Sequence, residues 1–279
     1  MTPLLFTLEA FAISIAAGVL GSLLGLGGGI IVIPALTLLL GIDIRFAIGA
    51  SIITIIATSS GAAAAYVRER MTNLRVAMWL ELGTTTGAIT GAYLAGLIES
   101  RYLYIIFAVI LGYSAMMMLR KRKEIAAADL MPTPWATRLR LSSSYYDEAV
   151  GREIPYTVVN ARLGLGLMYI AGVVSGLLGI GSGALKVPAM DLGMRLPIKV
   201  STATSNFMIG VTGAASAGVY FMRGDINPFI VAPVAAGVIL GATLGSRLLG
   251  RIQSSTIRIL FVVVLIWVSV EMFLKGVNQ

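Results

Sequence analysis

Two glycine-rich stretches decide the fold: Gly18–Pro34 (GVLGSLLGLGGGIIVIP) and Gly172–Pro188 (GVVSGLLGIGSGALKVP). They align without a gap at an offset of 154, and eight of the seventeen positions are identical. Each lies inside an apolar run and ends on a proline, so each predicts a helix that is interrupted within the run. The same offset pairs Gly83, Gly87 and Gly91 with glycines of the second half. The chain is therefore predicted to contain two similar halves.

Composition places the chain in a membrane. Of its 279 residues 57% are hydrophobic and 12% charged, with a mean hydropathy of +0.91, whereas about a quarter of the residues of a soluble domain are charged. Cysteine and histidine are absent, which excludes disulfides, thiol chemistry, Cys/His metal sites and an imidazole proton relay. We expect no cofactor and no metal.

Apolar segments follow in the same order in both halves. About 20 apolar residues cross a hydrocarbon core, and each half contains four long segments and one short one, the short one directly after the glycine motif. The segments of the first half are Leu4–Leu24, Ile30–Leu40, Ala47–Val67, Val76–Ile98 and Tyr102–Leu119, and those of the second are Leu163–Ile180, Ala184–Leu192, Val200–Met222, Phe229–Leu249 and Ile257–Leu274. The expected fold is an all-α polytopic membrane protein with two repeats of about five segments and broken or re-entrant short helices. The first segment lacks a cleavage motif and is expected to be retained.

Charge predicts the orientation. Five segments per half is an odd number, so the second repeat should enter the membrane from the opposite side, which gives inverted topology. With both termini outside, sixteen of the 21 basic residues lie on the inner side, as the positive-inside rule requires. The net charge of +8 therefore needs no nucleic acid, and we expect none as a partner. The expected location is the bacterial cytoplasmic membrane.

A polar linker separates the halves, so we divide the chain into a first repeat (1–119), a cytoplasmic linker (120–162) and a second repeat (163–279). Aromatic and β-branched residues flank Gly151, a pattern that a small β-hairpin would use. The favoured expectation is nevertheless a solvated tether, because linkers commonly are.

The interrupted helices are the first candidate for a binding site. Backbone freed by glycines is tolerated in a membrane only where it is buried in protein or lines a polar cavity. A helix that restarts there offers free N–H groups and partial positive charge, which suit an anion. The candidate residues are Gly27, Gly28 and Gly29 in the first motif and Gly181, Ser182 and Gly183 in the second. The alternative is close helix packing through small residues.

Polar side chains add to this candidate site. Lys186 lies three residues beyond Gly183, and a charge within the membrane is by default functional; the alternative is a lysine that snorkels to the interface.

Hydroxyls and an amide in the next long segment of each half could bind anion oxygens, or bond only their own helices: Ser51, Thr54, Thr204, Ser205 and Asn206. Glu81 either holds a coupling proton or, as we favour, sits at the interface beside Arg75. Asp191 is expected to be interfacial.

GSLLGLGGGIIVIP, GLLGIGSGALKVP and the spacing of Gly237, Gly241 and Gly245 resemble the sulfite exporter TauE/SafE family of membrane permeases over nearly the whole chain. The resemblance implies a secondary transporter that exports a small sulfur-containing anion, such as sulfite or the organosulfonate sulfoacetate. Ser182 and Lys186 depart from the first copy and are candidates for the substrate side.

Several alternatives stay open. One is a permease or channel-like transporter for another small anion such as a carboxylate. A non-transporting scaffold is disfavoured by the duplicated breaks, and an intramembrane enzyme by the absence of histidine, cysteine and paired carboxylates. Beyond the anion and the lipid bilayer, the expected partners are a coupling ion, proton or sodium, and a second copy of the chain in a homodimer.

Overall fold

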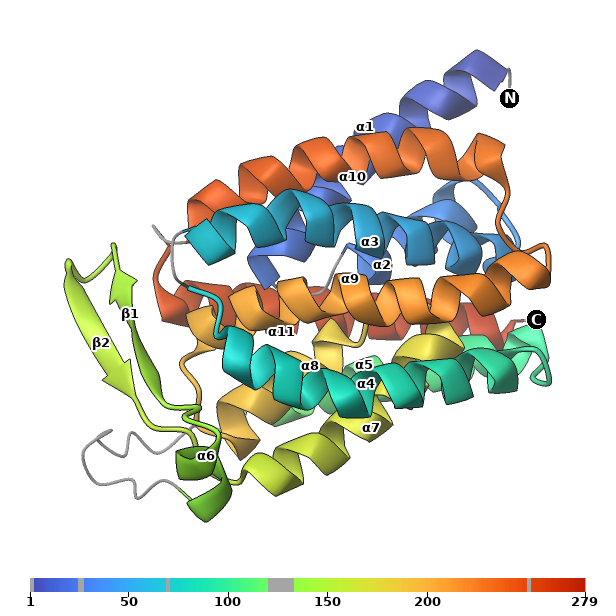
Figure 1. The fold of residues 1–279 in the computed structure, drawn as a ribbon. Helices are drawn as coiled ribbons and strands as arrows, with labels where there is room; N and C mark the ends of the chain where they lie inside the picture. Colours follow the sequence, from blue (N-terminus) through green and yellow to red (C-terminus); the bar gives the residue numbers. More distant parts are fainter. Residues whose placement is uncertain (1–2, 25–27, 69–70, 120–132, 250–251, 279) are drawn as a thin grey trace.

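A computed structural model describes residues 3–24, 28–68, 71–119, 133–249 and 252–278. Long helices dominate it (Figure 1): α1 (Pro3–Leu24), α3 (Ile44–Arg68), α4 (Leu74–Ala95), α5 (Ser100–Leu119), α7 (Ala161–Leu178), α9 (Ile198–Met222), α10 (Pro228–Leu249) and α11 (Ser254–Val277). The two short apolar segments contain α2 (Gly29–Pro34) and α8 (Gly183–Pro188), which continue as the π-helical turns Ala35–Leu39 and Ala189–Gly193. The linker adds α6 (Pro134–Arg138) and the strands β1 (Ser143–Asp147) and β2 (Arg152–Tyr156).

Five of the long helices, α1, α5, α7, α10 and α11, are long and apolar enough to cross a membrane. Large apolar side chains face outward over much of the bundle, among them Leu97, Phe229 and Trp267. Exposed apolar surface on this scale needs a membrane or a partner to cover it. The helical, membrane-protein part of the sequence prediction is confirmed.

The helices are arranged in a row with further helices packed against it. α10, α3, α9 and α4 lie side by side in that order, α1 packs on α10, and α7 packs on α4 (Figure 1). α5 and α11 pair with each other, and α11 also contacts α2 while α5 contacts α8. Both termini lie at one end of the bundle and the hairpin lies at the other (Figure 1). The polar helices α3 and α9 are thus held at the centre, against each other.

Glycines set the distance between α4 and α7. A Cβ at Gly176 would lie 1.9 Å from the carbonyl oxygen of Ala88, and one at Gly91 would lie 1.9 Å from that of Val173. The pair α1 and α10 uses glycines in the same way, since a Cβ at Gly241 would lie 2.1 Å from the carbonyl oxygen of Ile15. Backbone-to-backbone contact of this kind is how small residues bring membrane helices together.

We expect Gly176→Ala to destabilise the protein by about 1–3 kcal/mol, because the new methyl group meets backbone that cannot move aside. The matched control is Gly166→Ala on the same helix, where a Cβ would meet nothing within 4 Å. The melting temperatures of the two detergent-purified variants test this. Equal melting temperatures would show that the α4–α7 contact does not need glycine.

Left-handed backbone, and not proline, makes both helix breaks. Gly28 has φ 74°, Gly179 and Gly181 have φ 64° and 74°, and Ser182 has φ 55°, values that favour glycine. Pro34 and Pro188 instead lie inside the restarted helices, directly before the π-helical turns. Wider π turns commonly accommodate such local departures from α geometry. Left-handed Gly28 therefore precedes α2, left-handed Gly179 ends α7, and the prolines lie within the restarted helices.

The tether expected between the halves is wrong in part, because the described end of the linker folds. β1 and β2 pair antiparallel, with Asp147 opposite Arg152 across a turn that contains Gly151 at φ 71°. Buried Tyr145 and Tyr156 turn one face of this hairpin toward the bundle. Alternating buried positions need a surface to cover them, and the ends of the helices provide it. The basic run at the start of the linker lies outside the described residues.

Asn73 ties this hairpin to two helices. Its side-chain oxygen accepts from Val76 N at 3.1 Å and so caps α4. Its Nδ2 donates to the carbonyl of Leu141 at 2.7 Å and to Tyr156 Oη at 2.9 Å, and its backbone N–H donates to Thr204 Oγ1 at 3.1 Å. The hairpin is therefore fixed against the start of α4 and the first turns of α9.

Candidate anion site

The two helix breaks meet at the centre of the bundle. Ser51 Oγ donates a 2.6 Å hydrogen bond to the carbonyl of Gly179, which is the carbonyl at the end of α7. Gly29, the first residue of α2, packs beside them: a Cβ there would lie 2.3 Å from Ser51 Oγ and 3.2 Å from the Gly179 oxygen. Only glycine fits at this position. The start of α2 is thereby held against the end of α7.

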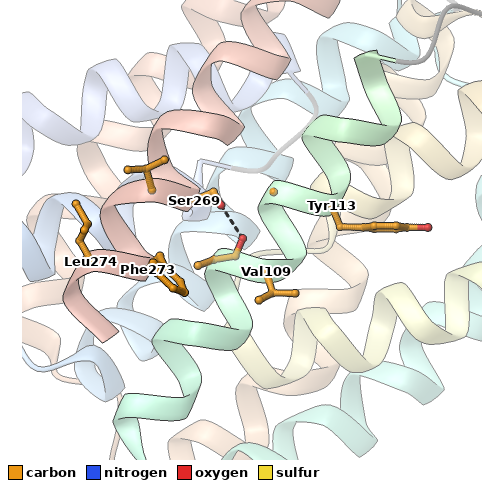
Figure 2. A pocket seen from close by; sticks show the side chains of 8 residues that line it. Val109, Tyr113, Ser269, Phe273 and Leu274 are labelled. Atoms are coloured by element: carbon orange, nitrogen blue, oxygen red, sulfur yellow. Dashed lines mark hydrogen bonds between the residues drawn. The ribbon is translucent and has the colours of Figure 1, made fainter. Parts of the chain in front are cut away.

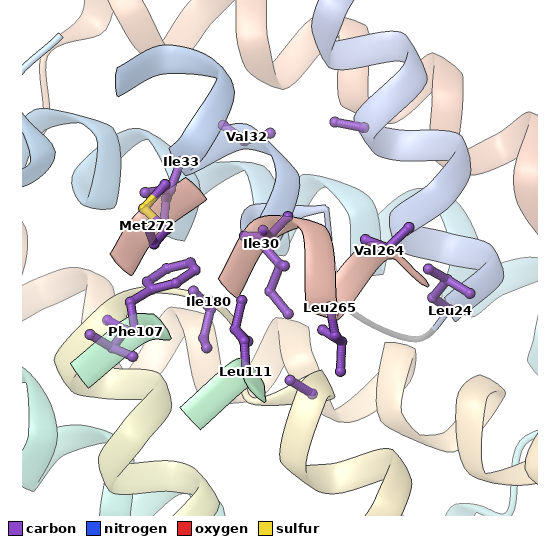
Figure 3. Close-up of a cluster of buried hydrophobic side chains, with 14 of the residues drawn as sticks. Leu24, Ile30, Val32, Ile33, Phe107, Leu111, Ile180, Val264, Leu265 and Met272 are labelled. Carbon is purple, nitrogen blue, oxygen red and sulfur yellow. The ribbon is translucent and has the colours of Figure 1, made fainter. Parts of the chain in front are cut away.

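Apolar side chains cover the breaks on the side of α5 and α11. Ile30 and Ile180 belong to the same buried cluster as Phe107, Leu111 and Leu265 (Figure 3). These side chains are apolar, and the hydroxyl of Tyr220 in the same cluster is already used, since it donates to the carbonyls of Gly176 and Leu177. A polar ligand near the breaks must therefore be bound from the other side, where α3 and α9 lie.

The restarted helices run in opposite directions, and α11 shows this directly. Lys275, in the last turn of α11, donates to the carbonyl of Thr37 at the end of the α2 segment. Arg258, in the first turns of α11, pairs with Asp191 at the end of the α8 segment, with 2.7 Å between Nη2 and Oδ2. The two ends of one helix thus hold the two broken segments. Asp191 is fully buried and pairs with Arg258; its expected interfacial position remains a prediction.

Lys186 is fully buried, at 0% exposure, and does not snorkel. Its ammonium donates to Thr212 Oγ1 at 2.7 Å and lies 3.9 Å from Glu81 Oε2. Among the described residues, Thr212 is its hydrogen-bond partner, although an ammonium has three hydrogens to donate. A buried cation needs an anion close by. Glu81 supplies one at long range, 3.9 Å away.

Glu81 is not placed beside Arg75. Its Oε1 accepts from Thr85 at 3.0 Å and from Thr212 at 2.8 Å, while Arg75 donates to the carbonyl of Arg140 in the linker. The expected pairing with Arg75 is therefore wrong, and the interfacial position of Glu81 remains a prediction. Lys186, Thr212 and Glu81 form one buried polar group, which we call the Lys186 triad. It joins α8, α9 and α4.

The first turns of α9 hold buried polar atoms without hydrogen-bond partners. Ser201 Oγ, Thr202 Oγ1 and Asn206 Oδ1 are of this kind. At 3.6 residues per turn, Ser201 and Ser205 lie on the same helix face as Thr212. Buried polar atoms are normally satisfied, so these mark a place where a polar ligand or water binds. Ser201 lies about three turns from Thr212 on that face, whereas Thr202 and Asn206 lie about 100° to 140° further round the helix.

The other predicted residues have defined roles in the described structure. The carbonyls of Gly28 and Ser182 accept the first hydrogen bonds of α2 and α8, and Gly183 begins α8 beside left-handed Gly181. Thr54 bonds the carbonyl of Ser51 at 2.7 Å, and Thr204 accepts from Asn73. Gly27 lies outside the described residues. The prediction that these groups bind substrate remains a prediction.

Sequence analysis overlooked Thr212, which links the lysine to the carboxylate. Its spacing of seven residues from Ser205 places it on the same helix face, and this spacing could have identified it. Asn206 also has an unforeseen partner, since its Nδ2 donates to the carbonyl of Ser22 at 2.7 Å. That bond ties α9 to the end of α1, just before the first break.

A groove elsewhere on the bundle does not take part in this site. It lies between α5 and α11, where Ser269 donates to the carbonyl of Ala108 at 2.7 Å (Figure 2). Its lining is otherwise apolar and aromatic, including Val109, Tyr113 and Phe273. No charged residue lines it. A groove of this kind suits lipid chains and not an anion.

Comparison with known proteins agrees with this architecture. The model of the family described as "Sulfite exporter TauE/SafE" matches residues 10–272. The chain is 28% identical over 272 residues to "Probable membrane transporter protein YunE" of Bacillus subtilis (strain 168), which covers 95% of this chain and 96% of that protein. A "Probable membrane transporter protein" of Xylella fastidiosa (strain Temecula1 / ATCC 700964) is 25% identical over 254 residues, covering 89% and 88%. No solved structure matches the chain.

The family match spans nearly the whole chain and includes both glycine motifs, the Lys186 triad and the polar face of α9. The relatives' names describe membrane transporters, and they align over almost their full length. The chain is a multi-pass membrane protein, and it belongs to the sulfite exporter TauE/SafE family of membrane transporters.

Proposed function

We propose that this protein is a secondary transporter that exports a small sulfur-containing anion, sulfite or an organosulfonate such as sulfoacetate, by alternating access. The observation on which this rests is the burial of Lys186 beside the second helix break, a cation whose hydrogen-bond partner among the described residues is Thr212. The family name supports the sulfur oxyanion. A permease or channel-like transporter for a carboxylate is the alternative, since the same cation would bind it.

The proposed site combines three kinds of donor. Lys186 supplies charge, the hydroxyls and amide on α9 orient the oxygens, and the N–H groups at the restarted helices add partial positive charge. A sulfonate or sulfite has three oxygens, so several donors in a convergent site suit it better than a single ion pair.

We propose further that the two halves are inverted repeats. The opposed directions of the α2 and α8 segments support this. So does the packing of the first helix of each half on a helix of the other half, α1 on α10 and α7 on α4. With the termini outside the bacterial cytoplasmic membrane, the hairpin is cytoplasmic. Because the chain has no cysteine, a single cysteine at exposed Val150 tests this: an impermeant maleimide added to intact cells should leave it unlabelled. Labelling would reverse the orientation.

A ligand panel tests the substrate class. We expect sulfite, sulfoacetate or another sulfonate to raise the melting temperature of the detergent-purified protein, whereas sulfate and acetate should not. A ligand at about 100 times its Kd stabilises by about 2.7 kcal/mol, which is readily measured. Selective stabilisation by acetate would favour the carboxylate alternative. No response to any anion, with a response to a cation or neutral solute, would contradict the proposed substrate class.

A further inference from the structure

The two oxygens of the Glu81 carboxylate have different surroundings. Oε1 accepts hydrogen bonds from Thr85 at 3.0 Å and Thr212 at 2.8 Å. Oε2 is buried without a hydrogen-bond partner and lies 3.9 Å from Lys186 Nζ. An unsatisfied buried oxygen is unusual. It is expected where a proton or a ligand binds in another state of the protein.

Thr212 can serve both protonation states of Glu81 without a movement of heavy atoms. Its hydroxyl has one hydrogen to donate and lies 2.8 Å from Glu81 Oε1 and 2.9 Å from the carbonyl of Met208. When Glu81 is ionised, Thr212 donates to the carboxylate. When Glu81 is protonated, the new O–H donates to Thr212, and Thr212 donates to Met208 instead. Lys186 can donate to Thr212 in either case.

The charge of Lys186 then links the proton to the anion. In the empty protein ionised Glu81 neutralises Lys186, and the buried pair has no net charge. Protonation of Glu81 leaves the buried ammonium without a counter-ion, which is costly. A monovalent anion beside Lys186 restores neutrality. Each ligand therefore increases the affinity for the other by the same factor, and both the empty and the loaded site are neutral.

Other titratable groups around Glu81 are more remote. α4 packs against α7 and α9, meets the linker at its first turns, and faces α8 through the triad. The titratable residues of these elements are Arg75 and Tyr93 on α4, Arg162 and Tyr169 on α7, Lys199 and Tyr220 on α9, Lys186 on α8, and Arg138, Arg140, Tyr145, Tyr146, Asp147, Glu148, Arg152, Glu153 and Tyr156 in the folded linker. Of the described residues, Lys186 has the charged atom within 4 Å of Glu81.

We propose that Glu81 binds the coupling proton, and that protein, proton and a monovalent anion, such as hydrogensulfite or a simple sulfonate, form one neutral loaded complex in which the anion beside Lys186 is transported together with the proton. This inference rests on the proposed function. The proton comes from water on the side from which the anion enters, and it returns to water when the anion leaves. Thr212 is a positioning residue that keeps both states hydrogen-bonded.

Calorimetric titration of the full-length protein with ethanesulfonate tests this, because that anion does not itself titrate near neutral pH. We expect uptake of close to one proton per anion, measured in buffers with different ionisation heats. The Kd should rise up to tenfold per pH unit where Glu81 is ionised in the free protein. Glu81→Gln should abolish both effects and bind the anion at about pH 8 as tightly as the wild type does in its acidic limit. Glu271→Gln, the same change on α11, is the matched control and should keep both effects.

Binding by the wild type without proton uptake and without pH dependence would overturn this inference and leave the proposed function standing. Binding that requires sodium at constant pH would overturn it too. Proton uptake that persists in Glu81→Gln would assign the proton to another group. No binding of ethanesulfonate, sulfite or sulfoacetate by the wild type at any pH would contradict the proposed function itself. If Glu81→Gln fails to fold, proton uptake by the wild type still shows whether proton and anion binding are coupled. Thr212→Val removes the hydroxyl that bonds Glu81 in both protonation states, and should therefore shift the pH range over which the Kd of the anion changes.

Discussion

Replacing Lys186 by methionine is expected to weaken binding of sulfite or a sulfonate by about 100-fold or more, because a desolvated charge pair that loses one partner typically costs 2–5 kcal/mol of affinity. Methionine has a similar length and is apolar, so it fills the same buried space. Lys186 is fully buried, so its charge faces the anion with little screening by solvent. Affinity measured by calorimetry is the direct readout.

Two further variants make this prediction specific. Lys275→Met removes a lysine of α11 that contacts the α2 segment and not the α8 segment. This variant should leave anion affinity unchanged. Lys186→Met combined with Glu81→Gln removes the buried pair together, and should fold at least as well as the single variant because no uncompensated carboxylate remains. Wild-type affinity in folded Lys186→Met protein would remove Lys186 from the site.

The second large effect is expected at the ion pair of Asp147 and Lys199, which joins the hairpin to α9. Lys199 Nζ and Asp147 Oδ1 are 2.7 Å apart, and their side chains are 1% and 4% exposed. Removing one partner of such a pair costs about 3–5 kcal/mol because the other charge is left buried. Asp147→Asn or Lys199→Met should therefore lower the melting temperature markedly. The double variant should recover most of the loss.

Acid should weaken the same contact. Burial alone would raise the pKa of Asp147, but the hydrogen bond and charge of Lys199, with a further bond from Tyr145, outweigh it and hold the pKa below its usual value. A lowered pKa stabilises the folded state above the ordinary value of 3.8, and this contribution is lost as the pH falls through the lowered pKa. Asp147→Asn should remove that part of the acid sensitivity, whereas exposed Glu148→Gln should not. Identical acid curves for wild type and Asp147→Asn would contradict a role for the pair.

Much of the helical architecture follows from local pattern. The ten expected segments all fall on helices, because apolar length and glycine position are local properties of the chain. The breaks at Gly28 and at Gly179 to Ser182 were likewise predictable, since left-handed backbone selects glycine. Lys186 stood out because a charge in an apolar run is rare.

Contacts between distant segments were not predictable in this way. Glu81 and Lys186 come from different halves, and nothing near Glu81 in the sequence distinguishes an interfacial carboxylate from one that faces a buried lysine. Asp191 has the same difficulty, because its partner Arg258 is on another helix. The hairpin was underestimated because its stability depends on Lys199 and Asn73, which belong to the helices it packs against.

Carrier activity at Lys186 can be measured as transport in proteoliposomes. Protein reconstituted with a sulfonate inside the vesicles should exchange it for isotope-labelled sulfonate outside, with a rate that saturates as its concentration rises. The account predicts saturable exchange by the wild type and by Lys275→Met, and none above background by folded Lys186→Met. Equal exchange by Lys186→Met and wild type, or a flux that does not saturate, would contradict a carrier that binds its anion at Lys186.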